Sequence, residues 1–177
     1  MLGPTGSRLA LNSRLRCLLE RGARKALPAG AGRPRPSQLV LAGNPAAGEA
    51  LIARIDAALA QAAPDGEEPI EALLWQPGGI VAGEQALVSD LLARTGFANG
   101  ASARGLSQAD YVALEDVVAA PPDVLLVAGS AAGQTHPVLD RLPDMHRARF
   151  DTGLLYCGGP TIIRAADRLA AIRGGAS

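Results

Sequence analysis

The run Val124–Ala128 is the feature that most limits what this chain can fold into, because its five residues are all apolar. It is closed by Gly129 and offers no polar face to water. Strands of this kind lie in parallel sheets that are covered on both faces by helices. A second apolar run, Ile70–Trp75, precedes it, and the helical pattern Glu84–Thr95 lies between the two. Strand and helix patterns that alternate in this way predict an α/β lobe with a mostly parallel sheet.

A long helix is expected before the first strand, over Asn44–Ala63. Asn44 can cap its N-terminus, and Pro45 suits the first helical position, where a missing N–H costs nothing. Apolar residues then recur at Leu51, Ile55 and Leu59, which gives one apolar stripe. Further elements are expected in this order: a short helix over Leu114–Ala120, a helical turn over His136–Leu142, a weak strand over Arg149–Leu155 and a closing helix over Thr161–Ile172.

Composition divides the chain of 177 residues into two parts. Residues 1–40 form a basic leader rich in proline and glycine, with Glu20 as its one acid, and we expect it to be disordered or non-native sequence. Residues 41–177 hold the predicted lobe. The net charge of zero, and a basic leader without aromatic residues, argue against nucleic acid as a partner. No run of about 18 apolar residues spans a membrane, and no secretory signal begins the chain.

Three glycine-rich loops are expected beyond the carboxyl ends of the strands, where ligands bind in open α/β sheets. They are Gln76–Gly83, Gly129–Gly133 and Cys157–Pro160. The first follows a strand and precedes a helix, as phosphate-binding loops do. Its glycines nevertheless have neither the spacing of a P-loop nor that of a dinucleotide-binding loop, and no lysine lies near them. The sequence therefore predicts either a ligand cleft or simple turns, and no nucleotide site.

Residue types that carry catalysis or bind metals are sparse. His136 precedes a proline and is interpreted as the start of a helix, while His146 lies in a surface connection. Cys17 and Cys157 are isolated cysteines without the spacing of a zinc site. We expect no catalytic residue, no metal site and no cofactor.

Four segments in order resemble the C-terminal lobe of the substrate-binding proteins of ABC importers for iron-siderophore, haem and cobalamin. They are EALLWQPGGIVAGEQALVSDLLARTGFAN, ALEDVVAAPPDVLLVAG, HPVLDRLP and LLYCGGPTIIRAADRLA, and the likeness covers residues 42–177. The resemblance implies a Rossmann-like three-layer lobe preceded by a long helix. It also implies a function in binding, without enzymatic activity: capture of cobalamin, haem or a ferric siderophore, followed by docking onto an ABC permease at the membrane.

The resemblance implies residue roles as well. Ligand contacts would come from Trp75, Gln76, Gly79 and Ile80 in the first loop and from Tyr156 and Cys157 in the last. The aromatic pair matters most, because flat macrocycles are held by aromatic faces. Glu84, at the expected start of a helix, would meet the permease. Few cationic residues near these loops favour a corrinoid or haem over an anionic siderophore.

Two departures from the family shape the expectation. The family's N-terminal lobe and its export signal have no counterpart in this sequence, so we expect an incomplete copy. The resemblance implies a periplasmic protein, whereas a product without an export signal would stay in the cytoplasm. Two alternatives remain open: a small α/β enzyme that uses Cys157 or His136, and an interaction module whose basic arm contacts an acidic partner.

Overall fold

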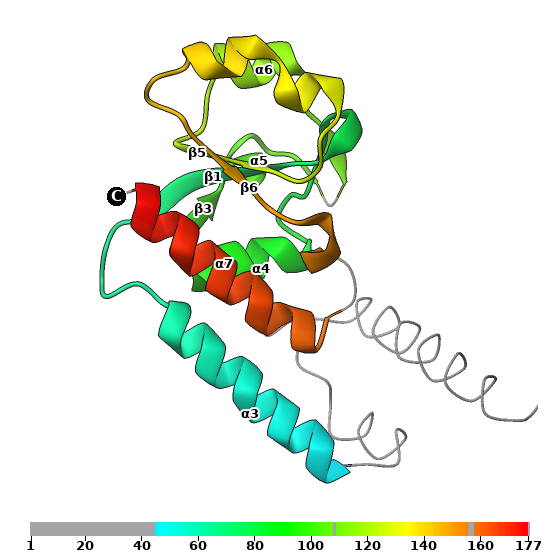
Figure 1. Cartoon of the computed structure of the whole chain (residues 1–177), viewed down its shortest axis with the longest axis vertical. Coiled ribbons are helices and arrows are strands. Elements are labelled where there is room, and N and C mark those ends of the chain that lie inside the picture. Colours follow the sequence, from blue (N-terminus) through cyan, green and yellow to red (C-terminus); the bar gives the residue numbers. More distant parts are fainter. Residues whose placement is uncertain (1–44, 108, 156–157, 177) are drawn as a thin grey trace, which may run out of the picture.

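The computed structural model describes residues 45–107, 109–155 and 158–176. Within these residues a six-stranded sheet lies between two layers of helices (Figure 1). The basic leader, together with Tyr156 and Cys157, lies outside the described residues. The arrangement confirms the predicted α/β lobe with its mostly parallel sheet.

The sheet is built around its two most apolar strands. Its strands are β1 (Ile70–Trp75), β2 (Ile80–Val81), β3 (Phe97–Asn99), β4 (Asp110–Tyr111), β5 (Val124–Val127) and β6 (His146–Arg149), in the order β4-β2-β1-β5-β6. β1 pairs in parallel with β5 and β3, and β5 pairs in parallel with β6. β2 and β4 are antiparallel additions at the carboxyl end of β1. The sheet is therefore parallel except at this one corner.

The predicted helices appear in the expected order, and α5 is an additional helix that the sequence did not predict. The α-helices are α3 (Pro45–Ala62), α4 (Leu87–Arg94), α5 (Gly100–Ala103), α6 (Leu114–Ala119) and α7 (Pro160–Ala176). Short 3-10 turns fill the connections: η2 (Pro77–Gly79), η3 (Ala132–Thr135), η4 (Pro137–Arg141) and η5 (Thr152–Leu154). The long helix is confirmed to within a residue at each end, since proline starts it and the sequence after Ala62 is rich in proline and glycine.

Three elements have boundaries that differ from the prediction. The closing helix continues to Ala176, four residues beyond the predicted Ile172. The last strand spans His146–Arg149, because this segment pairs with β5, and the sequence after it turns into η5. Its only buried residue is Ala148, so its pattern does not look like a strand. Helix α4 begins at Leu87, because Glu84 and Gln85 form a turn before it. Glu84 thus lies outside the first helical turn, and an interaction of its carboxylate with the helix dipole does not account for an acid at this position.

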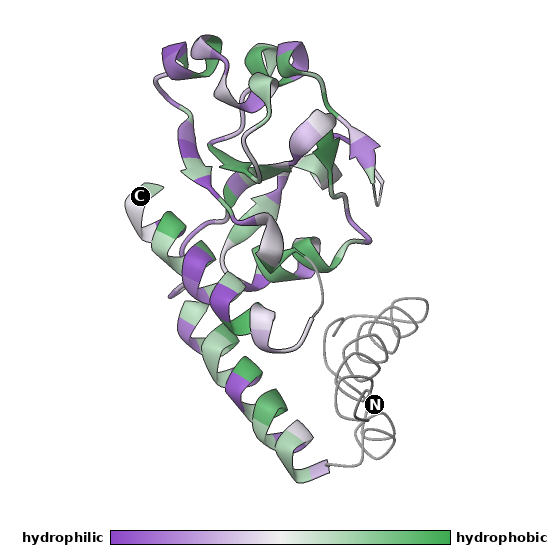
Figure 2. Cartoon of the chain, turned by 45° about the vertical axis from the view of Figure 1, so that its right-hand side comes forward, coloured by the Kyte–Doolittle hydropathy of each residue, from purple (hydrophilic) through white to green (hydrophobic). Residues whose placement is uncertain are grey.

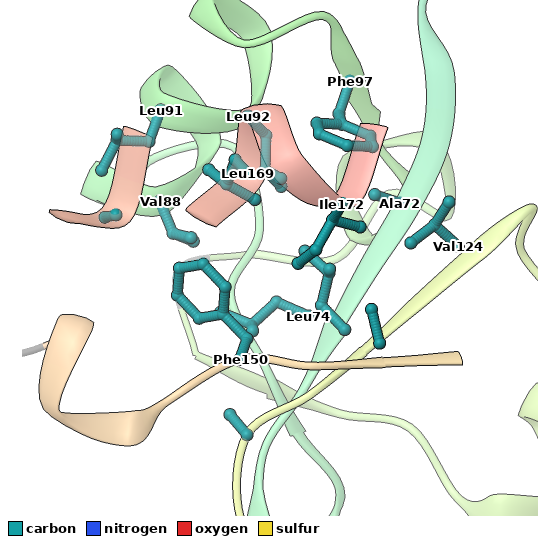
Figure 3. Close-up of a cluster of buried hydrophobic side chains, with 14 of the residues drawn as sticks. Ala72, Leu74, Val88, Leu91, Leu92, Phe97, Val124, Phe150, Leu169 and Ile172 are labelled. Carbon is teal, nitrogen blue, oxygen red and sulfur yellow. The ribbon is translucent and has the colours of Figure 1, made fainter. Parts of the chain in front are cut away.

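Alternate residues of β1 supply two separate cores, as the twofold side-chain period of a strand requires. Ala72 and Leu74 face α4 and α7, where they join Leu92, Leu169 and other buried side chains (Figure 3). On the opposite face Leu73 and Trp75 pack with residues of β5, α5, α6 and η4. β5 is buried at every position, which is the property that made its sequence informative.

Helix α3 packs against α7 and forms the outermost layer (Figure 1). Both helices carry mixed hydropathy along their length (Figure 2). The buried positions of α3 are Ile55, Ala58 and Ala62, spaced by three or four residues. None of the helices in the described ranges is both long and apolar enough to cross a membrane.

Candidate functional site

The loop Gln76–Gly83 is held against the protein by its glycines. Gly78 and Gly79 have φ values of 78° and 80°, which disfavour any side chain. A Cβ on Gly79 would lie 2.4 Å from the Tyr111 ring, and one on Gly83 would lie 2.0 Å from the Leu106 carbonyl oxygen. Gly79 and Gly83 are therefore required by close packing of the loop on β4 and the segment before it, whereas Gly78 is favoured by its backbone conformation alone.

Amide groups in this loop point inward. The N–H of Gln76 donates to the Ile80 carbonyl at 2.8 Å, that of Gly79 to Gln76 at 3.1 Å, and that of Gly83 to Ser107 at 2.8 Å. A phosphate-binding loop needs such groups free to face the anion. This geometry agrees with the exclusion of a nucleotide site from the glycine spacing.

Trp75 lies beneath the loop. Its side chain is 3% exposed, and its indole Nε1–H donates to the Val112 carbonyl at 2.9 Å. The Trp75 carbonyl accepts from the Gln134 amide at 2.8 Å and from the Ala128 N–H at 3.1 Å. One residue thus connects β1, the segment after β4 and the loop after β5, and Trp75 positions the loop from below.

Ile80 and Tyr111 are the large apolar or aromatic side chains that the described part of the chain exposes most, at 47% and 62%. They are register partners across β2 and β4, and so lie side by side on one face of this pair. β2 follows directly from the carboxyl end of β1 through η2. The exposed pair therefore lies at the edge of the sheet where ligands bind in open α/β folds.

Sequence reasoning named Ile80 but missed Tyr111. The strand that carries Tyr111 has two residues, which is too short for a periodic pattern. One signal in the sequence could have drawn attention to Tyr111: it is one of two tyrosines in a chain with few aromatic residues.

The other predicted site residues are placed in different ways. Gln76 is half-buried at the start of the loop, Gly79 is buried under Tyr111, and Glu84 is exposed in the turn before α4. Gln76, Gly79 and Ile80 share one loop, and Trp75, the fourth predicted contact from this region, lies buried beneath it. Tyr156 and Cys157 lie outside the described residues.

The loop Gly129–Gly133 is tied to the first loop by one buried side chain. Gln134 donates from Nε2 to the Trp75 carbonyl and accepts at Oε1 from the Ala131 N–H at 2.9 Å. A Cβ on Gly129 would lie 2.7 Å from the Pro77 ring. The two loops therefore form one rigid rim at the carboxyl ends of β1 and β5.

The histidines have structural explanations. His136 caps η4, since its Nδ1 accepts from the Val138 N–H at 3.2 Å. His146 is exposed on the edge strand β6. In the described ranges, no group of three or more histidine, cysteine, aspartate or glutamate residues could hold a metal ion.

A mostly parallel sheet covered on both faces, with the exposed Ile80–Tyr111 pair at its carboxyl edge, defines the class of α/β lobe to which this chain belongs. The sequence profile of the periplasmic binding protein family matches residues 40–148. The chain belongs to this family, whose members are binding proteins. A search of curated protein sequences gives no significant match.

Solved structures of periplasmic binding proteins share the fold of this chain. The haem-binding protein RhuT of Roseiflexus is 26% identical, with a TM-score of 0.62 over 78% of this chain and 60% of RhuT. The haem-binding protein HutB of Vibrio cholerae is 19% identical, with a TM-score of 0.61 over 82% of this chain and 64% of HutB. The vitamin B12-binding protein BtuF of the same organism is 14% identical, with a TM-score of 0.59 over 73% of this chain and 53% of BtuF. The chain thus spans less than two thirds of each relative.

Proposed function

We propose that this chain acts in the solute-binding component of an ABC importer and that its ligand is a metal chelate or corrinoid: haem, cobalamin or a ferric siderophore. Family membership supports a binding role. The observation that carries the ligand class is the exposed Ile80–Tyr111 pair at the carboxyl edge of the sheet. An aromatic ring beside an aliphatic side chain suits a large, flat and largely apolar ligand.

The residues in and around the first loop have different roles in this proposal. Ile80 and Tyr111 contact the ligand, together with the half-buried Gln76. Trp75 and Gly79 were predicted as ligand contacts, but both are buried and take other roles in this proposal. Gly79 lets the tyrosine ring lie close to the loop, and Trp75 fixes the loop from beneath. Tyr156 and Cys157, from the last loop, complete the contact in this proposal.

Titration with haem, cyanocobalamin and a ferric hydroxamate siderophore tests the ligand class. Because Trp75 is the single tryptophan and lies under the rim, quenching of its fluorescence reports binding there. We expect saturable binding of at least one ligand, weakened roughly tenfold in Tyr111→Ala by the loss of about 1.4 kcal/mol of contact energy.

Ile52→Ala, on α3, is the control and should bind as the unchanged chain does. Absence of saturable binding for all three ligands would overturn the ligand class. Equal affinity of Tyr111→Ala and the unchanged chain would overturn the placement of the site.

The permease-docking role of Glu84 belongs to the same proposal. Its support is exposure: the side chain stands in a turn at the end of the ligand-side loop, where an arginine of a partner could reach it. The compartment that follows from this role is the periplasm.

Glu84→Gln tests the docking role. The exchange should lower ligand uptake by cells that carry the importer and leave ligand affinity in solution unchanged, because only the carboxylate charge is removed. Glu49→Gln, an exposed residue on α3, is the matched control. If Glu84→Gln and Glu49→Gln cells take up ligand equally, Glu84 has no docking role.

A further inference from the structure

A cavity of about 600 Å³ opens at the carboxyl ends of β5 and β6, beside the middle of α7. Its volume lies in the range of small-molecule sites. Leu154 provides most of the apolar surface, because it is half-buried, whereas Val127 and Phe150 line the cavity but are 6% and 2% exposed. The Phe150 ring packs among residues of the α4–α7 core (Figure 3).

The charged lining of this cavity is unbalanced. Arg149, Arg164 and Arg168 line it together with one acid, Asp151. The Asp151 carboxylate accepts from the Gly153 N–H at 2.7 Å, and so caps η5. In the described part of the chain, none of the three arginines forms an ion pair, although Arg94, Arg104, Arg147 and Arg173 each do.

One of the three arginines is held in place before any ligand arrives. Arg168 donates from Nε and Nη2 to the Arg149 carbonyl, at 3.1 and 2.8 Å. A guanidinium carries five N–H donors, so others remain for a further acceptor. Arg164 precedes Arg168 by one helical turn on α7, which places both on the same face.

We infer that this cavity binds an oxyanion, a carboxylate or phosphate group carried by a small molecule. Arginine is the side chain best suited to such groups, because its planar donors match two oxygens at once. The half-buried Leu154, with Phe150 behind it, accommodates the carbon body of the molecule. The hydroxyl of Thr152, which also lines the cavity, adds an uncharged hydrogen-bond donor.

This inference does not rest on the proposed function, since the cavity would bind an oxyanion whether or not the lobe carries metal chelates. The expectation of few cationic residues concerned the candidate loops, whereas Arg149, Arg164 and Arg168 lie on β6 and α7. The fold gathers them from a strand end and a helix at the ligand side of the sheet.

Citrate and inorganic phosphate, each titrated into the full chain at low ionic strength, test the inference. Calorimetry should show saturable binding of at least one, and chemical shifts of isotope-labelled protein should move in η5 and around Arg164. We expect Arg164→Ala to weaken binding roughly tenfold, as the loss of one charge-assisted contact implies. Binding should also weaken as salt is added.

Arg141→Ala, an exposed arginine on η4 outside the cavity, is the matched control and should bind normally. Arg164 makes no hydrogen bond in the described structure, so its loss leaves the fold intact; thermal unfolding of the variant checks this. Competition between citrate and phosphate would support one shared oxyanion site, and binding of one alone would assign it to that chemistry. Failure of both anions to bind, or equal binding by Arg164→Ala, would overturn the inference.

Discussion

Replacing Trp75 by alanine should lower the free energy of unfolding by about 3–5 kcal/mol, the range found for large buried aromatic side chains. The ring is 3% exposed and packs with residues of β5, α6 and η4. Its removal leaves a cavity and also strips the Val112 carbonyl of its indole partner. Urea denaturation followed by circular dichroism measures the change, since the variant has no tryptophan left to fluoresce.

Trp75→Phe separates these two contributions. It keeps most of the apolar contact but removes the N–H, so the loss should be smaller, about 1–3 kcal/mol for an unsatisfied buried carbonyl. A loss below about 1 kcal/mol for Trp75→Ala would contradict the buried placement of the ring. That result would instead favour an exposed Trp75 that contacts the ligand directly, as the sequence predicted.

Replacing Arg173 by methionine should cost about 1.5–3 kcal/mol, the value of hydrogen bonds to charged groups. Arg173 is 6% exposed near the end of α7. Its guanidinium donates to the Gly96 carbonyl and, from Nη2, to the Glu68 carbonyl and the Glu67 carboxylate, each at 3.0 Å. It therefore ties the last helix to the segments that lead into β1 and β3.

The methionine variant keeps the length of the side chain and its contact with Phe97, over whose ring the guanidinium lies. Arg94→Met is the control, because Arg94 forms an exposed pair with Asp90 one helical turn away. Pairs of this kind contribute about 0.3–0.5 kcal/mol. Equal losses in the free energy of unfolding for the two exchanges would show that the burial of Arg173 does not strengthen its contribution to stability.

The central elements of the fold could be predicted because their sequences obey one rule over several residues. Val124–Ala128 is apolar throughout, and α3 begins at a proline and repeats its apolar residues at helical spacing. The corner made by β2 and β4 could not be predicted, since each of these strands has two residues. Their pairing depends on a long-range contact, in which Val112 donates to Gly79 and accepts from Trp75.

The candidate site was predicted in part for the same reason. The first loop was recognised by its glycines, and the structure shows that Gly79 and Gly83 are needed for close packing. Tyr111 and the arginine cavity were missed, because they arise only when distant segments meet. Arg173 was missed because a charged residue near the end of a chain indicates surface, whereas here it is buried.

The sequence of β6, His-Arg-Ala-Arg, also has a consequence for how the lobe behaves among its own copies. β6 is the outer strand next to β5, and only Ala148 is buried. Open strand edges invite another chain to add its own strand, and natural proteins prevent this by placing positive charges there. Arg147 is paired with Asp140, whereas Arg149 forms no ion pair in the described part of the chain, so its charge would repel the same edge of a second molecule. The arginine that hid this strand from prediction therefore disfavours pairing between two copies of the sheet.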